Sequence, residues 1–324
     1  MVLAPCPACA SDSSTPFDDA FDAAADVPYL SSLSVRRDGV VVREAYFLHT
    51  SATTPHDVRS VTKTVTALLI GAAIDAGCIT SVDQPIGELL GDHAPSEPAK
   101  AAITVRDLLT MTSGLDWFED GALGYNQWIQ APDQVAYALA PALVAPPGTM
   151  FNYNSGALHV LSAILSHACV PTRAFADQHL FGPLGIASPG WEIDNQGLAN
   201  GAAGVRLTNP QLAEIGQLIL DRGAHDGVQL VAAAYVDEMI APQASTCYPS
   251  NGTPEYGFGI WLGDKPPIGS FALAEGFGGQ FIAVVPSARA VVVATTNWQG
   301  LGAQAGTDFR QLYDVLVAKL LPAL

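Results

Sequence analysis

The periodicity of hydrophobic and polar residues changes twice along the chain. After a short helical pattern at residues 17–25, the stretch SVRRDGVVVREAYF alternates between apolar and polar residues on both sides of Asp38-Gly39. This alternation predicts a β-hairpin, and Gly39 suits the positive φ angle of a tight turn. From residue 83 to residue 200 the pattern is that of helices and loops, punctuated by Pro and Gly.

The C-terminal part of the chain returns to strand-like patterns. Four apolar segments, YGFGIWLG, SFALAEGF, QFIAVVP and AVVVATTNW, precede a final helical stretch, FRQLYDVLVAKLL. Strands at both ends with helices between them predict one sheet built from both termini and a mostly helical second lobe. We therefore expect a flexible tail at 1–14, an α/β domain formed by 15–82 and 201–324, and a helical lobe at 83–200. A cleft between two lobes is a usual place for a small-molecule site.

Composition and charge argue against several classes of partner. Apolar residues make up 49% and charged residues 14% of the chain, as in globular proteins. The formal charge of −17 argues against nucleic acid and against anionic membrane surfaces, since both bind clustered positive charge. No apolar stretch reaches the roughly 18 residues of a membrane-spanning helix without polar interruption, so no transmembrane segment is expected. The oligomeric state is not indicated.

The histidines show no zinc-binding spacing, and we expect neither a metal nor a cofactor. His159 and His167 are expected to be structural. Cys6 and Cys9 form a CPAC pair followed by ASDSSTP, which is typical of a flexible tail rather than of a zinc or redox site. A disulfide between Cys169 and another cysteine, Cys247, is an option in an oxidising compartment.

The N-terminal residues leave the localisation open. The start, MVLAPC, lacks the basic and long apolar regions of a signal peptide. The chain is therefore either cytoplasmic or begins inside an export segment that has been lost.

A serine and a lysine open the long apolar stretch DVRSVTKTVTALLIGAAIDAG, residues 57–77. Ser60 and Lys63 share one helix face, which lets the lysine approach the serine hydroxyl and act as the base that a serine nucleophile needs. Because most of this helix must be buried, the Lys63 ammonium would lose hydration, and its neutral amine becomes accessible near neutral pH. The Ser60 N–H, unpaired at the helix start, could help to bind an oxyanion. The alternative is a serine helix cap with an exposed lysine.

Two further segments carry candidate site residues. In PPGTMFNYNSGALHVLSAIL, Tyr153 and Ser155 precede an amphipathic helix, and a tyrosine at a cleft can deliver a proton to a leaving group. In EGFGGQFIAVVP, glycines next to a strand allow a close backbone approach and could offer a second oxyanion N–H, at Phe277 or Gly278. Taken alone, the tyrosine could pack under a turn and the glycines could form a tight hairpin.

Together and in this order, the three segments resemble the serine β-lactamase-related family. This family includes class C β-lactamases, D-alanyl-D-alanine carboxypeptidases, family VIII esterases and 6-aminohexanoate-dimer hydrolases. The resemblance covers nearly the whole chain and is carried by VRSVTKTVTALLIG, ITVRDLLTMTSGLDW, PGTMFNYNSGALHVLSAIL, HLFGPLGI, LTNPQLAEIGQLIL and GFGGQFIAVVP. It implies Ser60 as nucleophile, Lys63 as its base partner and Tyr153 as proton shuttle. It also implies an α+β fold of the β-lactamase/transpeptidase type, with an antiparallel sheet flanked by helices and an all-helical lobe.

Two departures from the family pattern narrow the expected activity. The β-lactamase Tyr-x-Asn motif is Tyr153-Asn154-Ser155 here, a form similar to that of the 6-aminohexanoate-dimer hydrolase branch. The Lys/His-Thr-Gly strand motif, which supplies a cation for the β-lactam carboxylate, is Gly-Phe-Gly at 276–278. We therefore expect a serine hydrolase of small-molecule carboxylic esters or simple amides. β-Lactamase or D-Ala-D-Ala carboxypeptidase activity is the first alternative, and a non-catalytic binding protein with this fold is the second.

The substrate pocket is expected in the Gly-rich stretch SGLDWFEDGALGYNQWIQAPDQ, which contains Trp117, Tyr125 and Trp128. Aromatic side chains beside a cleft can enclose an acyl chain by burying apolar area. The hypothesis is that Tyr125 and Trp128 form a movable lid hinged at Gly121 and Gly124. The alternative is that these aromatic residues pack the helical lobe.

Overall fold

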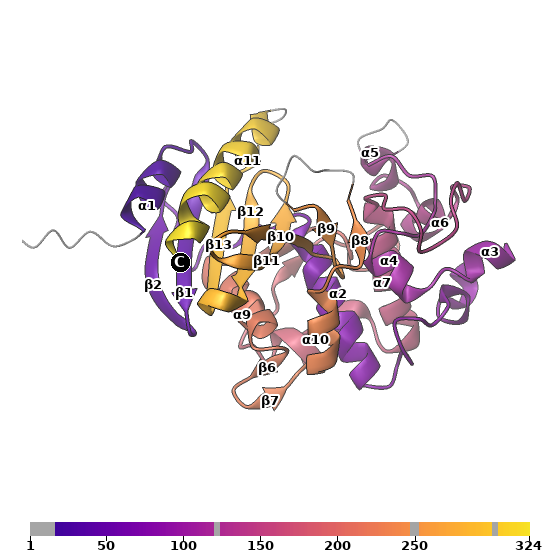
Figure 1. The fold of residues 1–324 in the computed structure, drawn as a ribbon. Helices are drawn as coiled ribbons and strands as arrows, with labels where there is room; N and C mark the ends of the chain where they lie inside the picture. The colour runs from indigo at the N-terminus through magenta and orange to yellow at the C-terminus, as the bar shows by residue number, and fades with distance from the viewer. Residues whose placement is uncertain (1–16, 120–123, 247–252, 300–303) are drawn as a thin grey trace, which may run out of the picture.

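The computed structural model describes residues 17–119, 124–246, 253–299 and 304–324 (Figure 1). The expected tail at 1–14 lies outside the described residues, as do Gly121 and Cys247. Within the described ranges, no helix combines the length and apolar character needed to cross a membrane.

An eight-stranded sheet occupies one half of the molecule (Figure 1). In sheet order, its strands are β2 (Val40–Tyr46), β1 (Leu30–Arg37), β13 (Ala290–Thr296), β12 (Gln280–Val285), β11 (Gly269–Gly276), β10 (Trp261–Lys265), β9 (Glu255–Tyr256) and β8 (Ala244–Ser245). Every neighbouring pair is antiparallel, and Val35 of β1 lies opposite Val292 of β13. The prediction of an α+β fold with one antiparallel sheet built from both termini is confirmed.

The β1–β2 hairpin turns at Asp38-Gly39, as the alternation of apolar and polar residues predicted. The φ angle is 49° at Asp38 and 76° at Gly39. These left-handed values belong to the two-residue turns that match the twist of paired strands. The Asp38 N–H also donates to the Arg289 carbonyl at 2.9 Å, which attaches the turn to the β12–β13 connection.

Helices cover both faces of the sheet. On one face, α9 (Asn209–Leu220) is anchored by Asn209, whose Nδ2 donates to Ser32 Oγ at 2.9 Å and whose Oδ1 accepts from Ser34. On the other face, α11 (Gln304–Val315) packs a phenylalanine ring 5.4 Å from that of Phe281. The helix α1 (Asp18–Ala25) lies beside β2 and the end of the chain (Figure 1).

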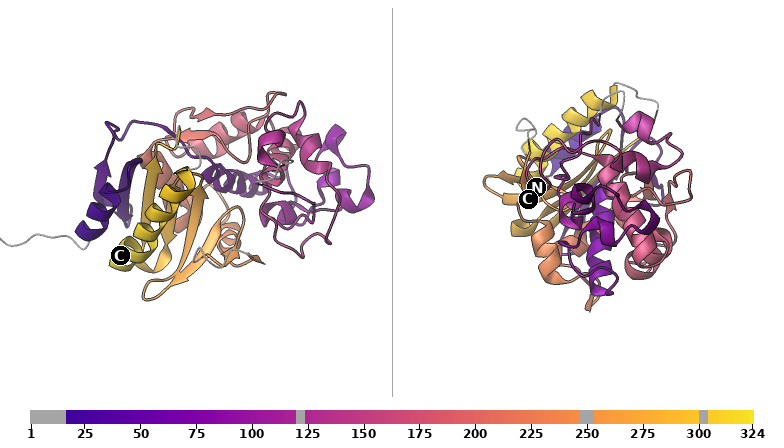
Figure 2. Two further views of the ribbon diagram at one scale, coloured as in Figure 1. Left: turned by 90° about the horizontal axis from the view of Figure 1, so that it is seen from above. Right: turned by 90° about the vertical axis from the view of Figure 1, so that its right-hand side faces the viewer.

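The helix α2 (Val61–Asp75) runs between the sheet and the helices of the other half (Figure 2). Every residue from Val61 to Ala73 is buried. Two polar side chains inside this run are satisfied by carbonyls on opposite sides, since Thr64 donates to Gly259 O at 2.7 Å and Thr66 to Gly201 O at 2.8 Å. Burial all round explains why the helix is apolar on every face rather than along one stripe.

The second half of the molecule holds most of the remaining helices, at the end opposite β1 and β2 (Figure 2). The remaining α-helices are α3 (Pro98–Ala101), α4 (Val105–Leu109), α5 (Tyr125–Trp128), α6 (Gln134–Leu139), α7 (Ser155–Ala168), α8 (Thr172–Ala176) and α10 (Ala233–Met239). Short 3-10 or π turns are η1 (Ile86–Glu88), η2 (Gly91–His93), η3 (Asp177–Phe181), η5 (Pro286–Ala288), η6 (Leu316–Leu320) and η7 (Leu321–Ala323).

Two small sheets complete the fold. Their strands are β3 (His56–Asp57), β5 (Val205–Leu207) and β4 (Gly190–Trp191) in one, and β6 (Ala224–His225) and β7 (Val228–Gln229) in the other. The described part of 83–200 therefore contains one short strand, β4, among its helices. The division into two domains at residues 83 and 200 stays a prediction.

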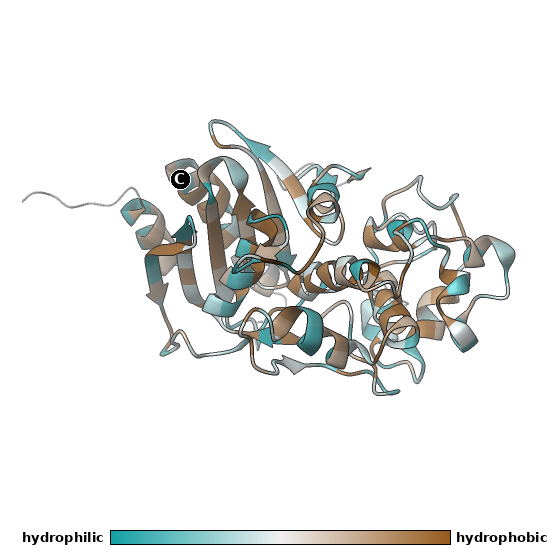
Figure 3. Ribbon diagram, turned by 90° about the horizontal axis from the view of Figure 1, so that it is seen from below, coloured by the Kyte–Doolittle hydropathy of each residue, from teal (hydrophilic) through white to brown (hydrophobic). Residues whose placement is uncertain are grey.

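Hydrophobic segments follow the strands of the large sheet, whereas peripheral loops are more polar (Figure 3).

Cys169 pairs with Cys78 and not with Cys247. The Cα atoms of Cys78 and Cys169 are 5.4 Å apart, and the two residues form a disulfide. Cys78 follows the C-terminus of α2 and Cys169 follows that of α7, so the bridge joins the ends of two packed helices. The sequence offered no sign that these two helix ends meet.

Trp117 and Trp128 lie in the core of the helical half, which contradicts the expectation that they wall a pocket. Trp128 is fully buried, and its Nε1 donates to Gln134 O at 3.0 Å. Its ring centroid lies 6.2 Å from that of Trp117, which is also buried. A lid containing Trp128 would have to break this packing. Gly124, expected as a hinge, is itself packed tightly against the Phe118 carbonyl.

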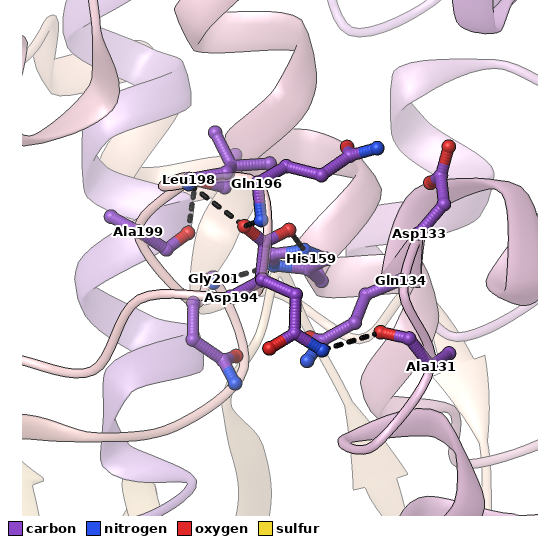
Figure 4. Close-up of polar contacts among 12 residues, drawn as sticks. Ala131, Asp133, Gln134, His159, Asp194, Gln196, Leu198, Ala199 and Gly201 are labelled. Atoms are coloured by element: carbon purple, nitrogen blue, oxygen red, sulfur yellow. Dashed lines mark hydrogen bonds and ion pairs between the residues drawn. The ribbon is translucent and has the colours of Figure 1, made fainter.

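Figure 4 shows a buried histidine–aspartate pair, whose histidine ring centroid lies 5.4 Å from that of Trp128. His159 Nε2 is 3.1 Å from Asp194 Oδ2, and both side chains are fully enclosed. His159 Nδ1 accepts from the Gly201 N–H at 3.3 Å, so a neutral imidazole protonated at Nε2 satisfies both contacts. Asp194 Oδ1 also accepts from two backbone N–H groups of the same loop, each at 2.8 Å. The pair holds the loop 194–201 against α7, a structural role.

The burial of Trp128 generates a stability prediction. Trp128→Ala should lower the free energy of unfolding by about 3–5 kcal/mol, because it leaves a cavity and an unpaired Gln134 carbonyl. Denaturant unfolding followed by circular dichroism measures this change. Phe277→Ala is the matched control, since the Phe277 side chain is half exposed and its removal should change stability little. Equal destabilisation by the two substitutions would contradict the core position of Trp128.

Candidate active site

Ser60 stands at the first turn of α2, after a backbone bend that the sequence did not reveal. Arg59 has a φ of 48°, and its N–H donates to Asp57 Oδ1 at 2.9 Å. This left-handed residue lies in the three-residue connection between β3 and α2, residues 58–60, and turns the chain into the helix. Ser60 occupies the N-cap position, but its side chain caps no backbone N–H. The alternative interpretation of Ser60 as a helix cap is therefore not supported.

Lys63 lies beneath Ser60 and is fully enclosed. Its Nζ is 2.8 Å from Ser60 Oγ and 3.1 Å from the Ala202 carbonyl oxygen, and the residue is 1% exposed. Burial lowers the pKa of Lys63 from 10.5 to about 7, against an opposing effect of Glu119 and with a smaller lowering by Arg59. A substantial fraction of the amine is thus neutral near pH 7 and can accept the Ser60 proton.

Tyr153 joins the pair from a segment far along the chain. It directly precedes α7, whose N-cap Asn154 accepts from the Ala157 N–H at 3.0 Å. The Lys63 Nζ is 4.9 Å from the centre of the Tyr153 ring, and the ring stacks on Trp261 with centroids 5.6 Å apart. Burial raises the pKa of Tyr153 well above 10, although a hydrogen bond with Ser60 acts in the opposite direction. The phenol therefore stays protonated.

Ser155 does not face the cavity but holds a glutamate that does. Ser155 is fully buried, its hydroxyl donates to Glu119 Oε1, and its N–H donates to Glu119 Oε2 at 3.0 Å. Trp117 Nε1 also donates to Glu119 Oε2, at 2.7 Å. Sequence reasoning missed Glu119, although it is an acidic residue inside the very stretch expected to form the pocket. Its pairing with Ser155 explains why a serine follows Tyr153-Asn154.

The Ser60, Tyr153 and Glu119 side chains meet at a cavity of about 550 Å³. The residues lining it are Arg59, Ser60, Glu119, Tyr125, Asn126, Tyr153, Trp261, Glu275, Phe277 and Trp298. Tyr125 is thus the one residue of the three expected pocket aromatics that lines this cavity. Its hydroxyl accepts from Arg59 at 2.8 Å, and Arg59 also lies 4.7 Å from the centre of the Trp298 ring.

The turn after β11 approaches the start of α2 closely. A Cβ added at Gly276 would lie 2.3 Å from the Val58 carbonyl oxygen, so only glycine fits there. Phe277 lines the cavity, whereas Gly278 does not. Among the described residues, none accepts a hydrogen bond from the Ser60 or Phe277 N–H. These two N–H groups remain candidates for binding an oxyanion, with Phe277 favoured over Gly278.

The described residues contain no cluster of side chains suited to a metal ion. No group of three or more His, Cys, Asp or Glu side chains there is arranged to hold a metal ion. The candidate site therefore consists of a serine, a lysine, a tyrosine and their carboxylate and aromatic neighbours.

The fold is shared with hydrolases and penicillin-binding proteins. A candidate 6-aminohexanoate-dimer hydrolase from Bacillus anthracis superposes with a TM-score of 0.70 at 17% identity, over 91% of this chain and 82% of that one. An octameric penicillin-binding protein homologue from Pyrococcus abyssi superposes with a TM-score of 0.73 at 20% identity, over 94% of this chain and 77% of that one. EstCE1, a hydrolase with promiscuous acyltransferase activity, superposes with a TM-score of 0.71 at 18% identity, over 92% of this chain and 96% of that one.

A search of curated proteins gave no significant match. The family model described as Beta-lactamase matches residues 17–316, most of the chain. This match agrees with the resemblance found in the sequence motifs and with the shared fold. The chain belongs to the beta-lactamase family.

Proposed function

We propose that this chain is a serine hydrolase that cleaves carboxylic esters or simple amides through an acyl-enzyme on Ser60. The contact that carries the proposal is the 2.8 Å approach of the buried Lys63 Nζ to Ser60 Oγ. A lysine whose pKa is lowered to about 7 is a base matched to neutral pH, and general bases work best when their pKa lies near the operating pH. Membership of a hydrolase family supports the same reaction class.

In the acylation step, neutral Lys63 accepts the proton of Ser60 while Oγ attacks the substrate carbonyl carbon. The Ser60 and Phe277 N–H groups bind the oxygen that becomes negative. The Lys63 ammonium then returns a proton through the Tyr153 hydroxyl, which donates its own proton to the leaving oxygen or nitrogen. Because the pKa of Tyr153 is raised, the tyrosine serves as a relay and not as a second base. Water releases the acyl group by the same path in reverse.

Among the residues that the structure describes, none offers a free cation at the position of the family's strand motif. Residue 276, where the family motif carries lysine or histidine, is a glycine that has no space for a side chain beside the Val58 carbonyl. Arg59 lines the cavity but donates to Tyr125 and lies 3.7 Å from Asp57. Ester and simple amide cleavage requires no such anchor, which favours these substrates over cephalosporins.

A fluorophosphonate should label the protein at one position, Ser60. Intact mass and peptide mapping identify the adduct, and Ser60→Ala should abolish it. Lys63→Ala should slow labelling by about 10²–10⁴-fold, because the hydroxyl loses its base. Lys100→Ala is the matched control, since Lys100 is also buried yet lies outside the cavity, at 3.2 Å from the Ala140 carbonyl. Absence of labelling in the folded protein would favour a non-catalytic binding protein.

The rate of Ser60 acylation should rise with pH and level off above an inflection near pH 7. The reactive form is the neutral amine, whose fraction grows as pH passes the lowered pKa of Lys63 upward. An unperturbed lysine would move the inflection to about pH 10. Single-turnover kinetics with an ester across this range measures it. Glu275→Gln, which removes a second group titrating in the cavity at about 8, should keep the lower inflection.

Short-chain esters should be cleaved with a kcat/KM at least about a hundredfold above that for a chromogenic cephalosporin, a difference of roughly 2.7 kcal/mol in transition-state binding. The reason is the lack of a cation at position 276. Steady-state assays with p-nitrophenyl butyrate and nitrocefin, with Ser60→Ala as the blank, make the comparison. Equal values would mean that another residue, such as Arg59, anchors the β-lactam carboxylate.

A further inference from the structure

Glu275 is a cavity-lining carboxyl group that the described residues leave without a partner. It precedes the last residue of β11, and it lines the same cavity as Ser60. Within the described part of the chain, no group donates a hydrogen bond to Glu275 and no cation pairs with it. Glu119, the other glutamate that lines this cavity, by contrast accepts hydrogen bonds from the Ser155 N–H and from Trp117 Nε1. Glu275 is partly exposed at the cavity, and a carboxylate there that lacks a protein partner remains available to a ligand.

The cations near the cavity are already engaged. Arg59 donates to the Tyr125 hydroxyl and lies beside Asp57, while the Lys63 Nζ contacts Ser60 and the Ala202 carbonyl. Accordingly, burial alone accounts for the rise of the Glu275 pKa to about 8. The charge of Glu275 also raises the pKa of Tyr153, which places this carboxyl within electrostatic range of the reacting groups.

Aromatic rings line the remaining cavity walls. Tyr153 stacks on Trp261, and Phe277 meets Trp298 edge to face with ring centroids 5.9 Å apart. A carboxylate together with aromatic rings is the combination that attracts organic cations, through charge-assisted hydrogen bonds and cation–π contacts. A bound ammonium group also favours the ionised form of Glu275, because an opposite charge nearby lowers the pKa of a carboxyl group.

We propose that Glu275 binds the ammonium group of amine-bearing ester or amide substrates. The ammonium donates hydrogen bonds to the carboxylate and lies against the aromatic rings, while the carbonyl is presented to Ser60. The carboxyl group of Glu275 alone sets this preference. The protein therefore still accepts neutral esters but cleaves them less efficiently than amine-bearing esters. This specificity rests on the hydrolase function proposed above, whereas the binding of an amine does not require turnover.

Substrate selectivity tests the proposal through a ratio. The ratio is kcat/KM for p-nitrophenyl esters of ω-amino acids divided by kcat/KM for the matching esters in which a methyl group replaces the ammonium group. Glu275→Gln should lower the ratio of amino to methyl ester roughly tenfold or more, as expected for loss of a charge-assisted hydrogen bond. Glu88→Gln removes the same charge from an exposed position and should leave the ratio unchanged. An unchanged ratio in Glu275→Gln would overturn the proposal.

Calorimetry separates this specificity from the hydrolase function itself. n-Hexylamine should bind to the Ser60→Ala protein more tightly than hexanol, and Glu275→Gln in the same background should weaken amine binding about tenfold. If the wild-type protein cleaves neither ester but this difference holds, the hydrolase function fails and the amine site stands. If the protein binds the amine no better than the alcohol, or equally well with and without Glu275, the amine site is refuted.

Discussion

The burial of Lys63 against Ser60 is the interaction on which the rest of the site depends. An ammonium group enclosed on all sides has lost its hydration, and its contacts here are one hydroxyl and one carbonyl. Such an arrangement is tolerated because the amine can be neutral, as its lowered pKa indicates. The helix that carries it must therefore be covered on both sides, by the large sheet and by the helical half.

The second contact of Lys63, the Ala202 carbonyl, is positioned by an extended polar framework. Asn200 Oδ1 accepts from the N–H groups of Ala202 and Ala203, and Trp191 Nε1 donates to the Asn200 carbonyl at 2.7 Å. The preceding loop is attached to α7 by the His159–Asp194 pair (Figure 4). The helix α7 also begins directly after Tyr153. One helix of the second half thus fixes both the tyrosine and the loop that closes over Lys63.

Opposing charges around the cavity adjust the chemistry of this lysine. Glu119 favours the ammonium form of Lys63 and Arg59 disfavours it, while burial exceeds both effects. Glu119 is held by Ser155, which stands in the asparagine place of the β-lactamase motif, so this serine positions a carboxylate that lines the cavity. The cavity has glycine at 276, where the family motif carries a cation, and its described lining includes two glutamates, Glu119 and Glu275.

Local patterns in the sequence were sufficient for the hairpin at Asp38-Gly39, for the strands β10 to β13 and for the shared face of Ser60 and Lys63, because each depends on neighbouring residues alone. Tyr153 came from the family resemblance. The sequence could not separate Tyr125 from Trp128, since both are aromatic residues of one short helix, and only packing sends one to the cavity and the other into the core. The Glu119–Ser155 contact and the Cys78–Cys169 bridge join segments far apart in the chain, and the cavity brings Glu275 together with Ser60. The tertiary structure decided these features, because periodicity records which face of an element is buried but not which distant element covers it.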